Sequence, residues 1–407
     1  MSNNNFTDLS KTITKKINNS IKRKNGIFFT PQSIIKKNLE IIKNIDIEII
    51  DILEPSCGSC EFINVLDNIF DNVNITGIEY MELIFNSIKN LSYKNKFIAF
   101  NDNYITWNAD KKYDLIIGNP PYYVMKKDTV DAMYYQYFDG RPNIFILFII
   151  KSLSLLKNNG ILSFILPSNF LNCLYYDKVR RLINNNYKII DIQACDDDNY
   201  LNTAQNTIIF IIQNNNNTEN NKTYSLNMNG YTIFNTPDKI KKLNTLYVNS
   251  TNLHQLNFDV NIGNIIWNQC KDILTDDSRM TRLIYNSDII NGKISLHKYN
   301  NNAKKNFIHK DGINKRCIIV NRGYGTGKYT FDYCLLDVEY NYLLENHIIN
   351  IRYNGDDNEE EIYQKIINSF KNNKTQEFID LYFKNNAINT TEFKYIFPIF
   401  MNSDKTK

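Results

Sequence analysis

The sequence predicts an α/β protein with a parallel, doubly wound sheet, followed by a second region of mixed α+β type. Between about residues 49 and 213, short apolar runs alternate with segments of helical length, which is typical of βαβ units. The runs are nearly continuous in apolar residues, as strands covered on both faces require. A polar, Asn-rich stretch at 214–222 has no apolar period, and the alternation does not return beyond it.

Each element of the alternating region follows from a local pattern. An apolar helix is expected from about 143 to 157, with Gly160 as its stop signal. The seventh strand is expected to run antiparallel, because the polar stretch that separates it from the sixth is too short for a helical crossover. The seven strands are expected at 49–53, 74–78, 96–100, 113–117, 161–166, 188–192 and 207–212.

The chain divides into four predicted segments. Residues 1–24 form a basic N-terminal arm, and residues 25–213 form the α/β domain. Residues 214–222 are predicted as a linker because their composition is polar and of low complexity. Residues 223–407 form the second domain, in which short strands and loops accompany a helix expected near 359–370.

Composition excludes several classes of protein. The 407 residues are 43% hydrophobic and 22% charged, so the chain is neither disordered nor fibrous. The longest apolar run, 144–150, has seven residues, whereas a membrane span needs about 18. Seven cysteines, an odd number, fit a reducing compartment. No secretory signal is visible, so we expect a cytoplasmic protein, in the host cytoplasm or nucleoid, of viral or low-GC bacterial origin.

The strongest chemical signal is Asn-Pro-Pro-Tyr at 119–122, directly after an expected strand. Two prolines stiffen the backbone at the carboxyl edge of a parallel sheet, where ligands bind in such folds. The Asn119 side-chain oxygen and the Pro120 carbonyl can both accept from an exocyclic amino group. Tyr122 offers a face on which a planar base can stack. The alternative is a plain turn covered by Tyr122.

A second signal follows the first strand, where residues 54–62 read Glu-Pro-Ser-Cys-Gly-Ser-Cys-Glu-Phe. Small residues in a strand-to-helix loop let a ligand approach the backbone. Glu79 ends the second strand and can accept from both hydroxyls of a ribose, and Asp102 follows the third strand. Either acid can instead be a solvated loop residue. Cys57 and Cys60 also spell a redox-type pair, but no thioredoxin-like context surrounds them.

These motifs resemble those of the N6-adenine DNA methyltransferases that use S-adenosylmethionine. The order of the motifs is that of the gamma group, the TaqI type. In that order come a Thr-Pro segment, here Thr30-Pro31, the small-residue loop, Asn-Pro-Pro-Tyr and a long C-terminal domain. The resemblance covers about residues 20–215. It implies a Rossmann-like, seven-stranded methyltransferase domain at 25–213 and a DNA target-recognition domain at 223–407. Cys60 departs from the pattern, which usually has glycine there.

The resemblance also implies roles for individual residues. Asn119, Pro120 and Tyr122 would be catalytic, and Tyr200 would stack on the extruded base. Phe148 matches the aromatic residue that packs on the cofactor adenine, although plain helix core is the alternative. The cofactor-binding residues would be Thr30, Pro31, Glu54, Pro55, Ser56, Cys57, Gly58, Glu79, Asp102, Pro121 and Phe148.

The implied reaction is methyl transfer from S-adenosylmethionine to N6 of an adenine flipped out of double-stranded DNA. The protein would be a monomer, without a metal, and the modification enzyme of a restriction-modification system with a companion endonuclease. Residues 293–328 hold nine Lys or Arg and one acid, and residues 11–24 hold six and none. Such clusters suit DNA phosphates, although a solvated surface is the usual alternative. The expected DNA contacts are Lys304, Lys305, Lys315, Arg322 and Lys328.

Other functions share parts of these patterns. Methyltransferases of protein glutamine N5 or of RNA bases also use Asn-Pro-Pro-Tyr, but the glutamine enzymes place their extra domain in front. A catalytically silent DNA-binding module is disfavoured because Asn119 is present. The glycines at 323–327 fail the spacing of a phosphate loop, which excludes an NTPase.

Overall fold

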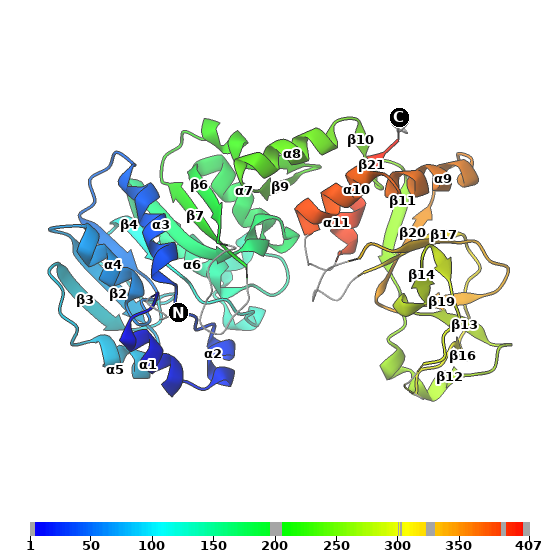
Figure 1. Ribbon diagram of the computed structural model, residues 1–407, viewed down its shortest axis with the longest axis horizontal. Coiled ribbons are helices and arrows are strands. Elements are labelled where there is room, and N and C mark those ends of the chain that lie inside the picture. Colours follow the sequence, from blue (N-terminus) through cyan, green and yellow to red (C-terminus); the bar gives the residue numbers. More distant parts are fainter. Residues whose placement is uncertain are drawn as a thin grey trace. The chain divides into compact units, whose positions relative to one another are not determined.

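The chain forms two compact units, Met1–Ile240 and Lys241–Lys407, in the computed structural model (Figure 1). The structure describes residues 5–195, 206–299, 301, 303–322, 330–383 and 388–401.

The first unit is built on a sheet of seven strands in the order β3-β2-β1-β4-β5-β7-β6. β7 pairs antiparallel with both β5 and β6, whereas the pairs from β3 through β5 are parallel. The predicted α/β class and the antiparallel seventh strand are therefore confirmed. The strands are β1 (Asp51–Glu54), β2 (Asn74–Glu79), β3 (Lys96–Asn101), β4 (Tyr113–Gly118), β5 (Leu156–Pro167), β6 (Lys188–Ala194) and β7 (Thr207–Gln213).

Helices cover both faces of this sheet, which explains the continuous apolar strands. In β4, Leu115 and Ile117 pack in one core with α3 and α4, while Ile116 packs in the other core with α6. Successive strand residues point to opposite faces. The helices are α1 (Asp8–Lys16), α2 (Asn19–Asn25), α3 (Gln32–Lys43), α4 (Glu61–Ile69), α5 (Glu82–Ile88), α6 (Ile144–Leu155), α7 (Asp177–Asn186) and α8 (Pro237–Tyr247), the last of which crosses the boundary between the units.

Gly160 has a different role from the predicted helix stop. Helix α6 already ends at Leu155, and Gly160 lies inside β5, where the pairing with β4 shifts register. A Cβ atom at Gly160 would lie 2.9 Å from the Tyr113 carbonyl oxygen. Glycine is therefore needed for the close approach of two strands.

The stretch predicted as a linker, 214–222, folds within the first unit. The Asn221 side chain is buried, accepts from Ile189 N at 2.7 Å and donates to the carbonyls of Asn184 and Tyr187. The hairpin of β8 (Ser225–Met228) and β9 (Tyr231–Phe234) follows and packs on α7. Because buried Asn221 satisfies backbone groups of the first unit, this stretch belongs to that unit, and the boundary between the units falls later, after Ile240.

The predicted N-terminal arm is also part of the first unit. Glu61, at the start of α4, accepts from Thr7 N at 2.8 Å and from Gln32 Nε2 at 3.0 Å. Ile13 of α1 is buried in a small cluster that includes Phe29. The segment is therefore joined to the start of α4 through the buried Glu61 carboxylate.

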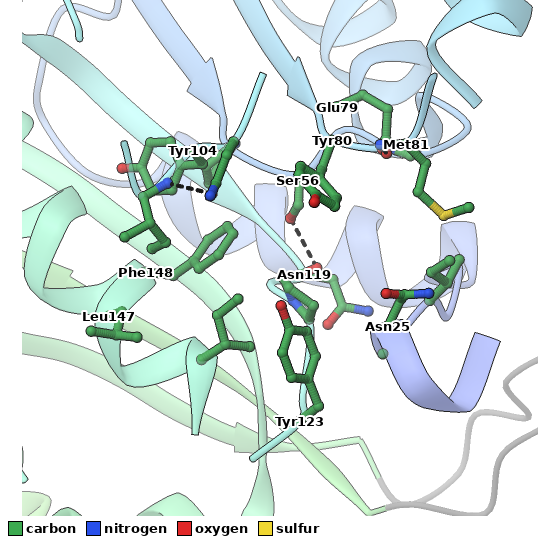
Figure 2. A pocket seen from close by; sticks show the side chains of 18 of the residues that line it. Asn25, Ser56, Glu79, Tyr80, Met81, Tyr104, Asn119, Tyr123, Leu147 and Phe148 are labelled. Carbon is green, nitrogen blue, oxygen red and sulfur yellow. Dashed lines mark hydrogen bonds between the residues drawn. The ribbon is translucent and has the colours of Figure 1, made fainter. Parts of the chain in front are cut away.

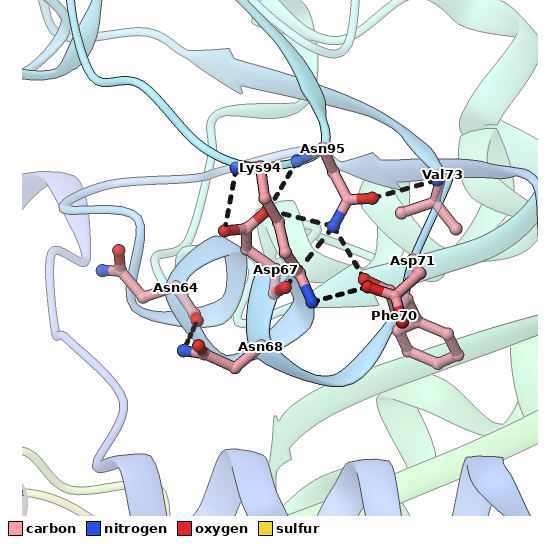
Figure 3. Close-up of polar contacts among 8 residues, drawn as sticks. All are labelled: Asn64, Asp67, Asn68, Phe70, Asp71, Val73, Lys94 and Asn95. Carbon is pink, nitrogen blue, oxygen red and sulfur yellow. Dashed lines mark hydrogen bonds and ion pairs between the residues drawn. The ribbon is translucent and has the colours of Figure 1, made fainter.

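A polar network closes the other end of α4 (Figure 3). Asn95 is 6% exposed, and its side chain accepts from Val73 N at 3.1 Å and donates to Asp67 and to the Phe70 carbonyl. Asp67 in turn accepts from Lys94 N. This network ties the loop before β3 to the turn before β2.

The second unit mixes small sheets and short helices, as the predicted α+β type requires. Two sheets have four strands each, in the orders β11-β20-β17-β18 and β12-β16-β13-β19. Helix α9 (Glu359–Phe370) has the predicted bounds. Within the described residues, we find no helix with the length and apolar character of a membrane span. The remaining elements are β10 (Ser250–Thr251), β11 (Phe258–Ile262), β12 (Leu274–Thr275), β13 (Thr281–Ile284), β14 (Ile289–Ile290), β15 (Lys293–Ile294), β16 (Phe307–Ile308), β17 (Cys317–Asn321), β18 (Tyr333–Leu336), β19 (Tyr342–Leu344), β20 (Ile348–Tyr353), β21 (Ile399–Phe400), α10 (Asn373–Phe378) and α11 (Thr390–Tyr395).

Candidate active site

A cavity of about 880 Å³ lies at the carboxyl ends of β1, β2 and β4 (Figure 2). This volume is in the range of pockets for small molecules and cofactors. Pro31, Pro120 and Tyr122 are absent from its lining, and Tyr200 lies outside the described residues. The predicted site residues that do line it are Thr30, Glu54, Pro55, Ser56, Cys57, Gly58, Glu79, Asp102, Asn119, Pro121 and Phe148.

The loop at 54–60 turns tightly between β1 and α4. Gly58 has φ +49°, and a Cβ there would lie 3.2 Å from the Phe29 ring. Cys60 also takes a left-handed conformation, with φ 62°, which glycine adopts at lower cost. Both thiols in this loop are buried. A hydrogen bond with Cys60, together with burial, raises the pKa of Cys57, and a protonated thiol argues against the redox alternative.

Glu79 holds this loop in place. Its carboxylate accepts from Gly58 N at 3.0 Å and from Met81 N at 2.7 Å. Burial raises the pKa of Glu79 to about 7, although these backbone donors oppose the shift. The carboxylate at the end of β2 is therefore poised to change charge near neutral pH.

Glu54 is the most buried of the described acids that line the cavity. It is 2% exposed, and burial raises its pKa well above the ordinary value. Its Oε2 atom has no hydrogen-bond partner among the described residues. A buried carboxylate oxygen without a partner is costly. A cationic ligand group in the cavity would remove that cost.

Asn119 joins the Asn-Pro-Pro-Tyr motif to two other segments. Its backbone carbonyl accepts from Ser56 Oγ at 3.1 Å (Figure 2). Its Nδ2 donates to the Phe28 carbonyl at 3.1 Å and to Thr30 Oγ1 at 3.0 Å. The side chain is thus held from the segment ahead of α3.

Tyr122, the last residue of the motif, and Tyr123, the next residue, have different surroundings. The Tyr122 hydroxyl lies 2.5 Å from Asn119 Oδ1 and 2.7 Å from the Ile165 carbonyl oxygen, so these two acceptors share its single proton. The centroid of its ring lies 6.1 Å from that of Phe145, in an edge-on arrangement. Tyr123 lines the cavity beside Asn119 (Figure 2). Tyr123 was not among the predicted site residues, although the sequence has a Tyr-Tyr doublet at 122–123.

Aromatic residues also line the part of the cavity near β2. Tyr80, directly after Glu79, is 69% exposed and lines the cavity, and it was not predicted. The signal for it was an aromatic residue next to the acid that ends a strand. Phe148 is 5% exposed, and its ring centroid lies 4.9 Å from that of Tyr104. It therefore belongs both to the core beside its helix and to the lining of the cavity.

The predicted DNA contacts in the second unit have varied surroundings. Lys304 Nζ lies 4.1 Å from the ring centre of Tyr285 and 4.3 Å from that of Tyr299, and burial lowers its pKa. This differs from the predicted phosphate contact, because the two rings already hold the ammonium. Lys305 pairs with Asp276 at 2.5 Å.

The remaining predicted DNA contacts lie farther along the chain. Lys315 is exposed, and Arg322 is half-buried. The Arg322 backbone N–H donates to the His347 carbonyl at 3.1 Å. Lys328 lies outside the described residues.

The comparisons with known proteins indicate a methyltransferase that uses S-adenosylmethionine. Residues 4–201 match the model of the Eco57I restriction-modification methylase family. This part of the chain is similar to the Eco57I restriction-modification methylases. The cofactor that this similarity supports is S-adenosylmethionine.

The chain is also similar to curated methyltransferases. The chain is 29% identical to the type II methyltransferase M.CvrRI of Paramecium bursaria Chlorella virus XZ-6E, over 97% of this chain and 99% of that one. It is 32% identical to the modification methylase CviBIII of Paramecium bursaria Chlorella virus NC1A, over 51% of this chain and 54% of that one. Among solved structures, a putative class I S-adenosylmethionine-dependent methyltransferase from Listeria monocytogenes aligns with a TM-score of 0.41 and 17% identity, over 53% of this chain and 71% of that one.

Proposed function

We propose that the protein is a site-specific DNA methyltransferase that transfers a methyl group from S-adenosylmethionine to N6 of a flipped adenine in double-stranded DNA. Its relatives of the restriction-modification type support DNA methylation. The proposal includes a role as the modification enzyme beside a companion endonuclease, acting as a monomer.

The observation that carries the proposal is the position of the Asn119 carboxamide. It lies at the end of β4 and lines the cavity that also contains Glu54 and Glu79. Asn119 Oδ1 and the Pro120 carbonyl would accept the two amino protons of adenine, which turns the nitrogen lone pair toward the methyl group. Positioning of this kind supplies most of the catalysis.

Base flipping costs a few kcal/mol, and aromatic stacking at about 1–3 kcal/mol per base can offset that cost. Tyr123 lines the cavity next to Asn119, so we add it to Tyr122 and Tyr200 as a candidate stacking residue.

Three acids that line the cavity, Glu54, Glu79 and Asp102, support the proposed cofactor site. S-adenosylmethionine supplies an electrophilic methyl group on a sulfonium. Glu54, with its unpartnered Oε2 atom, would face the cationic end of the cofactor. Ionised Glu79 would accept from the ribose hydroxyls, Asp102 would accept from the adenine amino group, and Tyr80 and Phe148 would contact the adenine ring.

The second unit would read the DNA. We keep Lys305, Lys315, Arg322 and Lys328 as proposed contacts and leave out Lys304, since two tyrosine rings hold its ammonium. Clustered cations predict an affinity that falls as salt concentration rises.

The test is to incubate the purified protein with duplex DNA and methyl-labelled S-adenosylmethionine, and to identify the methylated nucleoside by mass spectrometry. We expect N6-methyladenine, and no label with Asn119→Ala. N4-methylcytosine in the DNA would overturn the adenine assignment. Label found only in RNA or in protein glutamine would overturn DNA as the substrate.

A further inference from the structure

We infer that Thr30 and the Phe28 carbonyl orient the Asn119 carboxamide, so that Oδ1 and not Nδ2 is presented to the substrate. Thr30 is then a positioning residue for methyl transfer, in addition to lining the cofactor cavity. The inference rests on the proposed function, because it concerns the acceptor that the substrate amino group requires.

The orientation of this amide is a real chemical choice. The oxygen and nitrogen ends of a carboxamide have nearly the same shape, but the oxygen accepts hydrogen bonds and the nitrogen donates two. A substrate amino group needs an acceptor. An Asn119 side chain turned by 180° would instead direct donors at donors, and the acceptor pair would be lost.

The contacts of the Asn119 amide favour one orientation. Nδ2 faces two acceptors, the Phe28 carbonyl at 3.1 Å and Thr30 Oγ1 at 3.0 Å. Oδ1 lies 2.5 Å from the Tyr122 hydroxyl, whose single proton it shares with the Ile165 carbonyl. The Phe28 carbonyl can only accept, so the reversed amide would place two oxygens against each other there. Thr30 is 2% exposed, which protects this contact from competition by water.

The segment that carries Phe28 and Thr30 is itself fixed on both sides. Gly26, with φ +63°, approaches the catalytic motif so closely that a Cβ would lie 2.6 Å from Tyr122 N. On the other side, the Phe29 ring lies against Gly58 of the loop at 54–60. The acceptors for Nδ2 are therefore held by backbone packing and do not depend on a flexible side chain alone.

The experiment compares Thr30→Val with Thr30→Ser. Valine has nearly the shape of threonine and cannot accept a hydrogen bond, whereas serine keeps the hydroxyl. We expect single-turnover methyl transfer at saturating cofactor and DNA to be about tenfold slower in Thr30→Val, the equivalent of one lost hydrogen bond. Thr30→Ser should stay within about threefold of the wild type. S-adenosylmethionine affinity, measured by calorimetry, should change less than twofold in both.

If Thr30 acted in cofactor binding alone, Thr30→Val would weaken S-adenosylmethionine affinity and leave the transfer rate at saturation unchanged. That result, or equal rates for the valine and serine variants, would overturn the inference. Tyr122→Phe is a second variant, since it removes the donor to Oδ1 while leaving the ring. It should also slow transfer at saturation, and an unchanged rate would contradict the assigned orientation.

Failure of the proposed function would look different. The methylated product of the wild-type protein identifies the substrate, whichever it is. The ratio of rates between Thr30→Val and Thr30→Ser tests the orientation of Asn119 on that same product. A different product with the predicted ratio would remove the adenine proposal and keep the role of Thr30.

Discussion

The carboxyl edge of the first sheet and the basic stretch of the second unit differ in how they use polar residues. At the sheet edge, Glu54, Glu79 and Asn119 come from positions far apart in the sequence and line one cavity. In the basic stretch, Lys304 and Lys305 are sequence neighbours with different partners, two tyrosine rings and Asp276. Strand ends in a parallel sheet therefore predict a site, whereas a run of charges does not predict a free cationic surface.

The largest effect that sharpens this comparison is expected at the sheet edge. Asn119→Ala should lower the methyl-transfer rate at least about 100-fold, as for the loss of a positioned group that acts in the transition state. The affinity for S-adenosylmethionine should stay within about twofold. Single-turnover kinetics and calorimetry on the same preparation measure both, and near-wild-type turnover would contradict the assigned role.

A smaller effect is expected where the segment before α3 meets the Asn-Pro-Pro-Tyr motif. Gly26→Ala combines left-handed strain with a Cβ 2.6 Å from Tyr122 N, so we expect about 2–4 kcal/mol of lost stability. Gly140→Ala is the matched control, because Gly140 has φ +72° and no atom within 4 Å of the added Cβ. It should cost about 1–2 kcal/mol of strain alone. Denaturant unfolding measures both, and equal losses would show that the contact with Tyr122 is unimportant.

Glu79 provides a pH test of the same edge. Its pKa is raised from 4.5 to about 7, so about one tenth of the carboxyl is ionised at pH 6. Ribose hydroxyls need the ionised form, and S-adenosylmethionine affinity should therefore be about tenfold weaker at pH 6 than at pH 8. Glu79→Gln should be weak and independent of pH. A wild-type affinity that stays constant from pH 6 to 8 would remove Glu79 from the ribose contact.

The stability of the cofactor-free protein should respond to Glu79 in the opposite direction. A carboxyl with a raised pKa in the folded state contributes stability that is fully present below the unfolded value. That contribution is lost as the pH rises through about 7. Thermal unfolding of the wild type and of Glu79→Gln between pH 4.5 and about 7 tests whether the stability of the wild type falls as the pH rises.

The smallest effects are expected in the basic stretch of the second unit. Lys315 is exposed, so Lys315→Ala should reduce the slope of log affinity for DNA against log salt by about 1. Lys304→Ala should leave that slope unchanged and lower stability by about 1 kcal/mol, since it removes a cation between two rings. A reduced slope with Lys304→Ala and an unchanged slope with Lys315→Ala would restore Lys304 as a phosphate contact.

Local patterns in the sequence were sufficient for much of the fold. All seven predicted strands and helix α9 are present, because the period of apolar residues is a property of neighbouring positions. The acids at the ends of β1 and β2 and Asn119 at the end of β4 were also predictable, since parallel strands bring their carboxyl ends to one edge.

The tertiary structure alone decided the features that depend on residues far apart in the chain. Glu61 accepts a hydrogen bond from Thr7, 54 positions away in the sequence. Because of this contact, the segment predicted as a basic arm packs as part of the first unit. Asn119 meets the Phe28 carbonyl across 91 positions, and that contact sets which end of its amide is held. Asn221 satisfies buried backbone groups of Asn184 and Tyr187, so a stretch that is polar enough for a linker is folded. Composition records the polarity of such side chains, but only packing determines whether water or a distant backbone group becomes their partner.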